Sequence, residues 1–108
     1  MVLEDYLAIR PERRERLIRL IKEGRINVGP WYDLPDLWLV SGESLVRNLQ
    51  KGIQTCRDHG VEPMRFLFTP DQFGHNAAMP MISTGFGLKA GLCWRGTQIE
   101  THPTQFIW

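Results

Sequence analysis

The chain has 108 residues, enough for one small domain but not for two. Its 43% hydrophobic and 23% charged residues are ordinary for a soluble globular protein, and a formal net charge of +1 argues against nucleic acid or a membrane surface as partner. The sequence contains no apolar run of about 18 residues and no signal-peptide pattern, so neither a transmembrane helix nor a secretory leader is predicted.

The first third of the chain predicts a helix, a short strand and a loop. Apolar residues at helical spacing, with a proline suited to a first helical turn, predict a helix near residues 11–23. Its arginines alternate with glutamates, which favours a solvated face over a nucleic-acid patch. Residues 26–28 predict a strand. The aromatic and acidic segment 31–38 is broken by a proline and predicts a loop at the carboxyl end of that strand.

The rest of the chain continues the alternation of helix and strand. A serine-rich start followed by an apolar stripe predicts a helix over 43–58, and the apolar run 64–68 predicts a buried strand. Residues 74–85 have a helical pattern with a proline near the first turn. Residues 88–94 and the apolar end of the chain, 105–108, predict two further strands.

This rhythm predicts an α/β fold with parallel-sheet βα units and helical crossovers. The first residues enter a helix without a preceding strand, and the last four form a strand without a successor. A parallel sheet needs both faces covered, which so short a chain can scarcely do. We therefore expect residues 1–108 to be one partial domain, truncated at both ends. Its unpaired sheet edges favour a homo-oligomer.

The two cysteines, Cys56 and Cys93, lie far apart and lack the spacing of metal ligands. Free buried thiols are the simplest interpretation. Free thiols are typical of reducing compartments, so a cytoplasmic location is predicted.

Chemically useful residues come directly after the strand predicted at 64–68. Asp71 follows its carboxyl end, where α/β folds place their chemistry, and could point into a cleft. Phe73 could offer an apolar face to a sugar or another flat ligand, and Gly74 permits a tight turn or a close backbone approach. His75 could bind a metal or support a neighbouring group. The alternative is a helix capped by Asp71, with His75 on the polar surface.

Short blocks in a fixed order run through almost the whole chain. They are LEDYL with RPE (3–7, 10–12), GRI with GPWY (24–26, 29–32), SGESLVRNL (41–49), PDQFGH (70–75), and FG with WRG (86–87, 94–96). Each block alone is weak, but together they resemble the N-terminal catalytic domain of glycoside hydrolase family 38. These are the retaining α-mannosidases, and the likeness is greatest to the bacterial branch.

The resemblance implies a segment of a (β/α)7 barrel that acts on α-mannosides through a zinc site. Asp71 matches the aspartate that is both zinc ligand and catalytic nucleophile, and it would form a glycosyl-enzyme intermediate. Phe73 matches a ring near the bound sugar. Arg95 matches an arginine that can orient the nucleophile and contact sugar oxygens. Trp31 and Asp36 match a loop motif with a structural or cleft-lining role.

The remaining parts of such a site would lie outside this chain. The family's His-x-Asp zinc ligands would precede Met1, and its acid/base aspartate and last histidine ligand would follow Trp108. A single aspartate cannot make a zinc site, so the isolated chain is expected to bind no zinc tightly and to be inactive alone. In the family, the position of His75 is not a ligand, which favours a hydrogen-bonding role for it.

Two alternatives stand beside the enzyme. The chain could be a non-catalytic α/β module for carbohydrate binding or assembly. It could also belong to another metal-dependent carbohydrate hydrolase, such as a polysaccharide deacetylase, although the SGESL and WRG blocks speak against that class.

Overall fold

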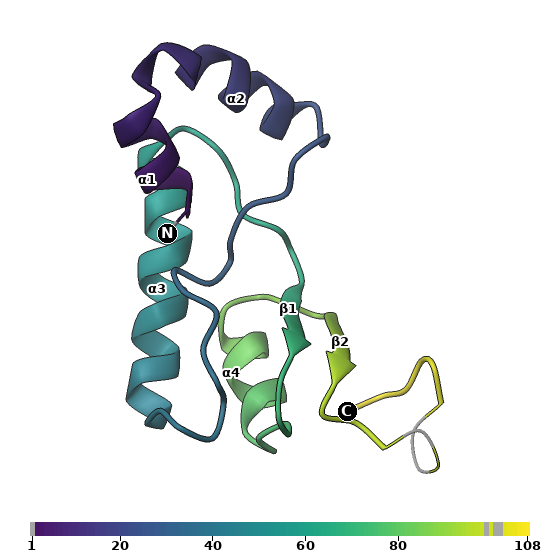
Figure 1. The fold of residues 1–108 in the computed structure, drawn as a ribbon. Helices are drawn as coiled ribbons and strands as arrows, with labels where there is room; N and C mark the ends of the chain where they lie inside the picture. Colours follow the sequence, from purple (N-terminus) through teal and green to yellow (C-terminus); the bar gives the residue numbers. More distant parts are fainter. Residues whose placement is uncertain (1, 99, 101–102) are drawn as a thin grey trace. The chain divides into compact units, whose positions relative to one another are not determined.

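The computed structural model describes residues 2–98, 100 and 103–108. The chain folds into two compact units, one made of Met1–Asp33 with Arg47–Met64 and the other of Leu34–Val46 with Arg65–Trp108. The helices and strands, in chain order, are α1 (Val2–Ile9), the 3-10 helix η1 (Pro11–Arg13), α2 (Arg14–Lys22), α3 (Gly42–Asp58), β1 (Leu67–Asp71), α4 (Met79–Gly85) and β2 (Gly91–Arg95) (Figure 1).

The first unit is built around a small apolar core. Helices α1 and α2 and the latter part of α3 contribute to it, together with the segment that follows α3. Its buried members are Leu3, Leu7, Ile21, Cys56 and Val61. Burial of these side chains is the main stabilising term for the unit.

The helix predicted near 11–23 is present, but it begins as η1 and continues as α2. Arg10 separates it from α1, because the residue before a proline is disfavoured in the helical region and Arg10 adopts φ −129° and ψ 60°. Gly24 ends α2 with φ 71°, and the Arg25 N–H donates to the Leu20 carbonyl at 2.9 Å. The sequence pattern alone does not show the break between α1 and the helix that follows it.

The strand predicted at 26–28 is wrong, since these residues form no regular strand. The Met64 N–H donates to the Val28 carbonyl at 2.9 Å, which joins two extended segments at one point. A strand requires a ladder of such bonds, and one contact does not make a ladder. Segment 31–38 contains neither helix nor strand, so the predicted loop is confirmed.

Helix α3 matches the prediction for 43–58 to within one residue. Ser41 provides the N-cap, because its Oγ accepts the Ser44 N–H at 3.1 Å and its carbonyl accepts the Leu45 N–H at 3.1 Å. Leu45 and Leu49 on its apolar stripe are buried. Gly60, with φ 78°, ends the segment.

The second unit contains a parallel pair of strands. β1 and β2 are aligned so that Leu67 lies opposite Gly91, Thr69 opposite Cys93, and Asp71 opposite Arg95. Both strands begin about three residues later than the apolar runs that predicted them. Hydrogen bonding, which defines a strand, continues past the last apolar residue of β1. Helix α4 connects the two strands, as expected for a parallel crossover.

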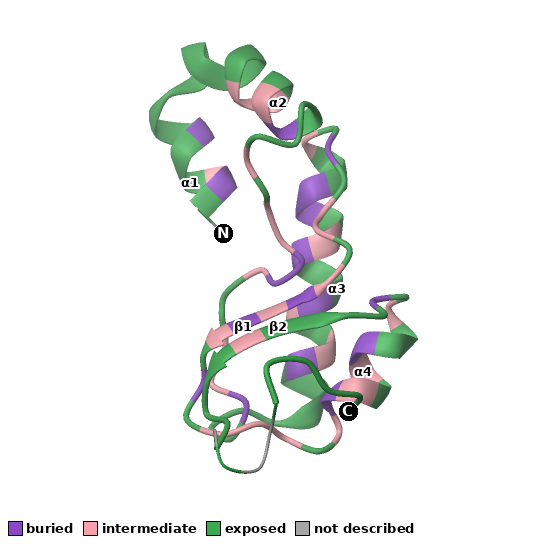
Figure 2. Cartoon of the chain, turned by 90° about the vertical axis from the view of Figure 1, so that its right-hand side faces the viewer, coloured by how far each residue is buried: buried purple, intermediate pink, exposed green. Residues whose placement is uncertain are grey.

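The two strands differ in how far they are buried. Alternate residues of β1 are buried, whereas β2 is almost entirely exposed (Figure 2). Helix α4 is shorter than the predicted helix at 74–85, because residues 74–78 form turns before it. Residues 103–108 form no strand, so the strand predicted at 105–108 is wrong. Apolar character alone does not create a strand without a partner to complete its backbone hydrogen bonds.

The mixed helix and strand fold with a parallel sheet agrees with the predicted α/β class. None of the described helices is long and apolar enough to cross a membrane. Both cysteines are free: Cys56 is buried, as predicted, whereas Cys93 is only partly buried.

Candidate active site

Asp71 and Arg95 form an ion pair where β1 and β2 end. The two residues lie opposite each other in the parallel register, and Arg95 Nε lies 3.0 Å from Asp71 Oδ1. Their side chains are 56% and 54% exposed, so a ligand can reach both groups. The structure thus brings Arg95 to the carboxylate of Asp71, as the resemblance implies. Asp71 is the last residue of β1 itself and does not follow the strand.

Two aromatic rings accompany the Arg95 guanidinium. Its Cζ lies 5.9 Å from the centre of the Phe73 ring and 6.0 Å from the centre of the Trp94 ring. A cation near an aromatic face is attracted by the ring quadrupole, which helps to hold the guanidinium in place. Phe73 is 73% exposed and Trp94 is 76% exposed. Both rings therefore present apolar surface beside the guanidinium, and the sequence, which has Trp94 in the WRG block, gave this ring no role.

Gln72 points inward between two exposed neighbours. It is buried; its Oε1 accepts the Leu37 N–H at 3.1 Å and its Nε2 donates to the Pro35 carbonyl at 2.9 Å. These bonds attach the loop at 35–37 to the end of β1. The sequence does not reveal this role, because nothing in the local pattern distinguishes a buried glutamine from an exposed one.

Two glycines near the ends of β1 and β2 lie where other parts of the chain come close. Gly96 has φ 85°, and a Cβ at this position would lie 2.8 Å from both the Gln72 carbonyl oxygen and the Gly74 nitrogen. Gly74 has φ 135°, and a Cβ there would lie 2.8 Å from Trp38 Nε1. The close approach predicted for Gly74 is confirmed, and both positions require the absence of a side chain.

His75 is tied to the end of β2. Its Nε2 lies 2.9 Å from the Arg95 carbonyl oxygen, so the hydrogen-bonding role predicted for it is confirmed. The ring meets Trp108 edge-on with 5.6 Å between centroids. Within the part of the chain that the structure describes, His75 Nδ1 is buried without a hydrogen-bond partner.

The alternative in which Asp71 caps a helix is wrong. Helix α4 begins only at Met79, its N-cap position is Ala78, and no side chain caps it. Asn76 Oδ1 accepts the Ala78 N–H at 2.9 Å and shapes the turn before α4. Asp71 therefore does not cap α4, and its carboxylate is not used for that structural role.

The loop motif residues Trp31 and Asp36 have local structural contacts. Trp31 is buried in the first unit. Asp36 Oδ1, in the second unit, accepts the Trp38 N–H at 3.0 Å, which is an Asx-type turn. The first unit also holds its part of this loop with Asn48, whose Oδ1 accepts the N–H groups of Tyr32 at 2.8 Å and Asp33 at 3.2 Å.

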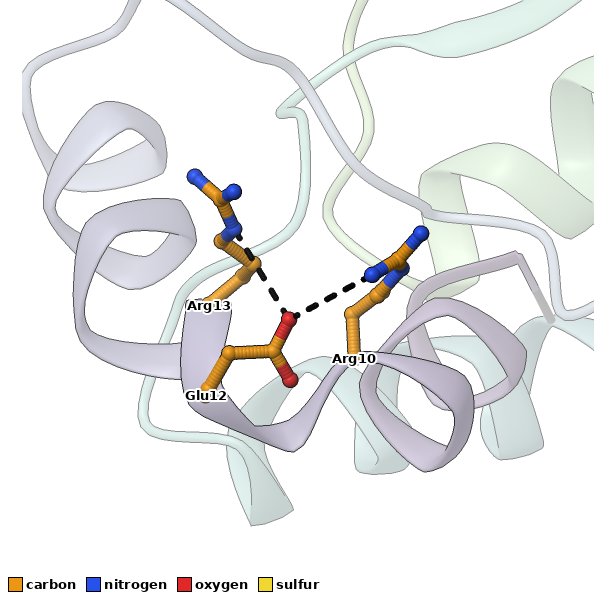
Figure 3. Close-up of polar contacts among 3 residues, drawn as sticks. All are labelled: Arg10, Glu12 and Arg13. Atoms are coloured by element: carbon orange, nitrogen blue, oxygen red, sulfur yellow. Dashed lines mark ion pairs between the residues drawn. The ribbon is translucent and has the colours of Figure 1, made fainter.

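Charges on the helices of the first unit are mixed in sign. Glu12 Oε1 lies 3.8 Å from Arg10 Nη1 and 3.8 Å from Arg13 Nε (Figure 3). All three side chains are more than half exposed, so these pairs add little stability. This arrangement confirms the predicted solvated face.

In the same unit, a hydrogen bond to Glu4 raises the pKa of Tyr32.

The described residues do not hold a complete metal site. Among residues 2–98, 100 and 103–108, no three His, Cys, Asp or Glu side chains are grouped so that they could bind an ion. Asp71 offers one exposed carboxylate, and a protein zinc site needs three or four ligands. Within the part of the chain that the structure describes, Asp71 could therefore supply one ligand of such a site.

Three comparisons relate this chain to known proteins. The sequence model described as "Glycosyl hydrolases family 38 N-terminal domain" matches residues 2–108. The chain is 38% identical over 106 residues to the "Putative mannosylglycerate hydrolase" of Halalkalibacterium halodurans, covering 98% of this chain and 11% of that protein. The structure titled "The crystal structure of an alpha-mannosidase from Enterococcus faecalis V583" matches with a TM-score of 0.82 and 34% identity. That match covers 90% of this chain and 11% of the other.

A parallel βα fold with a carboxylate and a guanidinium at its strand ends, together with these matches, defines the class: the chain is part of a glycosyl hydrolase domain. Specifically, it belongs to glycosyl hydrolase family 38, and its residues fall in the family's N-terminal domain. The chain spans 11% of the length of each of these two relatives.

Proposed function

We propose that the chain is part of an α-mannosidase that is active only as the full-length protein. The observation that supports this most directly is the Asp71–Arg95 ion pair, 3.0 Å long, at the ends of two parallel strands in a family 38 chain. The substrate would be an α-mannoside carbohydrate, and the reaction would retain the anomeric configuration.

In this proposal, Asp71 is the nucleophile. Its carboxylate attacks the anomeric carbon, the bond to the leaving oxygen breaks, and a covalent glycosyl-aspartate forms. Water then attacks the same carbon and gives one proton to the group that first acted as the acid, which releases mannose and restores the carboxylate. The acid that protonates the leaving oxygen would come from outside residues 1–108. Arg95 keeps the Asp71 carboxylate in one orientation, because the guanidinium contacts it from the opposite strand.

The exposed rings beside the pair suit a sugar. Phe73 presents an apolar face on which the carbon-bound hydrogens of a pyranose can pack, while Arg95 can contact its oxygens. Binding by both groups would place the anomeric carbon near Asp71, and such positioning accounts for a large part of enzymatic rate enhancement.

We further propose that the full-length protein uses a zinc ion, with Asp71 as the one ligand supplied by these residues. When bound, the ion would hold sugar hydroxyl groups and orient the ring. The other ligands would lie outside residues 1–108.

The β1–α4–β2 unit supports a place in a (β/α)7 barrel, of which residues 1–108 would be a segment truncated at both ends. The exposed β2 supports contact with further protein, either in the rest of that barrel or in a homo-oligomer. The free cysteines support a cytoplasmic location.

The proposal is tested with the full-length protein, supplied with zinc, on a panel that includes a chromogenic α-mannoside, α-linked mannose oligosaccharides and mannosylglycerate. We expect release of mannose, with the α anomer appearing first in the proton NMR spectrum. First release of the β anomer would reject the retaining mechanism. Binding of α-mannosides without turnover would instead support the non-catalytic module, and the panel also separates the possible aglycones.

A further inference from the structure

The ladder between β1 and β2 ends at the Asp71–Arg95 pair. Asp71 and Arg95 are the last residues of their strands, so the ladder does not hold the backbone that follows them. His75 supplies the next connection, because its Nε2 lies 2.9 Å from the Arg95 carbonyl oxygen. A carbonyl oxygen only accepts, so Nε2 carries the proton and donates it.

We propose that His75 is a positioning residue for the ion pair: by holding the Arg95 carbonyl, it fixes the Arg95 guanidinium against the Asp71 carboxylate. This inference rests on the proposed function, since it assigns His75 a role in the same site. His75 does not act on substrate in this proposal. It acts through Arg95.

The ring of His75 is itself restrained, as a positioning group must be. Trp108 contacts it edge-on at 5.6 Å, and its Nδ1 atom is buried. With Nε2 engaged by Arg95 and Nδ1 enclosed, neither nitrogen is available to bind a metal ion. The structure thus favours the hydrogen-bonding role of His75 over the metal-ligand role.

A close backbone contact at Gly96 also joins the segment after β2 to the segment after β1. A Cβ there would lie 2.8 Å from the Gln72 carbonyl oxygen and from the Gly74 nitrogen, so the chain after β2 passes directly against the chain after β1. The Arg95 carbonyl is therefore bound by His75, and the next residue, Gly96, lies against the chain after β1. Small displacements of catalytic groups reduce turnover strongly, so the connection matters for rate.

The test compares two replacements of His75 in the full-length protein. His75→Gln places an amide donor near the position of Nε2, and His75→Phe keeps a ring but has no donor. We expect His75→Phe to lower kcat about tenfold or more and His75→Gln to stay within about threefold, with KM changed less than kcat in both. Rescue by glutamine is the signature that a merely structural ring would not give.

His59→Phe is the matched control, because His59 lies in the other unit and hydrogen-bonds to Arg14. It should leave kcat unchanged. Should His75→Phe fail to fold, His75→Asn takes its place, since its amide mimics the Nδ1 side of the ring and cannot reach the carbonyl. Equal kcat losses in His75→Gln and in the second variant used, His75→Phe or His75→Asn, or no loss in either, would overturn the proposal.

A second readout does not depend on activity. Crystal structures of the variants should keep the distance between Arg95 Nε and Asp71 Oδ1 near 3.0 Å in His75→Gln and lengthen it beyond hydrogen-bond range in the donor-free variant. An unchanged distance in both would reject the positioning role. If the wild type hydrolyses no α-mannoside, the proposed function fails, while this structural comparison still decides the role of His75.

Discussion

Asp71 and Arg95 are neighbours both in the backbone ladder and through their side chains, with Arg95 Nε 3.0 Å from Asp71 Oδ1. Residues that lie opposite each other in a parallel pair project their side chains to the same face. The ion pair is therefore a consequence of strand register. A slip of one residue would send one of the two side chains to the other face and separate the charges.

Replacing Asp71 by asparagine should remove activity without unfolding the protein. An amide is a poor nucleophile and a weaker metal ligand, so we expect kcat for a chromogenic α-mannoside to fall about a thousandfold or more. The ion pair is half exposed, so its loss should cost at most about 1 kcal/mol of stability. Circular dichroism and thermal unfolding check the fold. A loss of activity below about tenfold would remove Asp71 from the role of nucleophile.

Replacing Arg95 by lysine should reduce turnover more than stability. Lysine keeps the charge but not the planar group that contacts Asp71 Oδ1 and lies near the Phe73 and Trp94 rings. We expect kcat to fall about tenfold or more while the unfolding midpoint moves by only a few degrees. Steady-state kinetics and calorimetry on the same preparation measure both. Unchanged kcat in Arg95→Lys would show that charge alone is sufficient.

Much of this site follows from local sequence. The apolar run before Asp71, the helix that separates it from the next apolar run, and the parallel geometry of such crossovers are enough to bring Asp71 and Arg95 to one edge. The cap of α3 at Ser41 is similarly local. These features depend on residues close together in the chain, so the spacing of apolar and capping residues predicts them directly.

The features that the sequence missed depend on partners far away in the chain. Residues 26–28 and 105–108 have strand composition, yet no neighbouring strand completes their backbone bonds in the described structure. Gln72 is buried only because the carbonyl of Pro35 and the N–H of Leu37 lie where its amide can reach them. No pattern within a few residues of Gln72 contains that information.

Gln72 should be important for stability although it lies between a proposed catalytic residue and an exposed ring. In Gln72→Leu, the Leu37 N–H and the Pro35 carbonyl lose their buried partner, so we expect a cost of about 1–3 kcal/mol. Denaturant unfolding measures this cost. Phe73→Ala is the matched control, because its side chain is 73% exposed and its removal should change stability by about 0.5 kcal/mol or less. Equal losses of stability in Gln72→Leu and Phe73→Ala would contradict the role of Gln72 in holding the loop at 35–37.

The two thiols should differ in reactivity. Burial raises the pKa of the Cys56 thiol above its usual value of 9.0, so the reactive thiolate forms only at higher pH. Cys93 is only partly buried. Alkylation of the native protein near pH 8, followed by peptide mass spectrometry, should label Cys93 first, and labelling of Cys56 should increase only at higher pH. Faster labelling of Cys56 at pH 8 would show that the core of the first unit opens readily.

Gly52, in the middle of α3, should be intolerant of any side chain. A Cβ at this position would lie 2.1 Å from the Pro30 carbonyl oxygen and 2.4 Å from both the Trp31 carbonyl carbon and the Tyr32 nitrogen. These atoms are backbone, and the segment that carries them is fastened to α3 by the bond from the Tyr32 N–H to Asn48 Oδ1 at 2.8 Å. It therefore cannot move aside as a flexible side chain would.

We expect Gly52→Ala to destabilise the protein by about 1–3 kcal/mol, the cost typical of inserting a group into packed structure, even though alanine has the higher helix propensity. Gly42→Ala is the control in the same helix, because nothing lies within 4 Å of a Cβ at Gly42. It should be neutral or stabilising by up to about 1 kcal/mol. Thermal and denaturant unfolding of both variants, made in the full-length protein, measure the difference. A stable Gly52→Ala would mean that residues 30–32 do not pack against α3 as described.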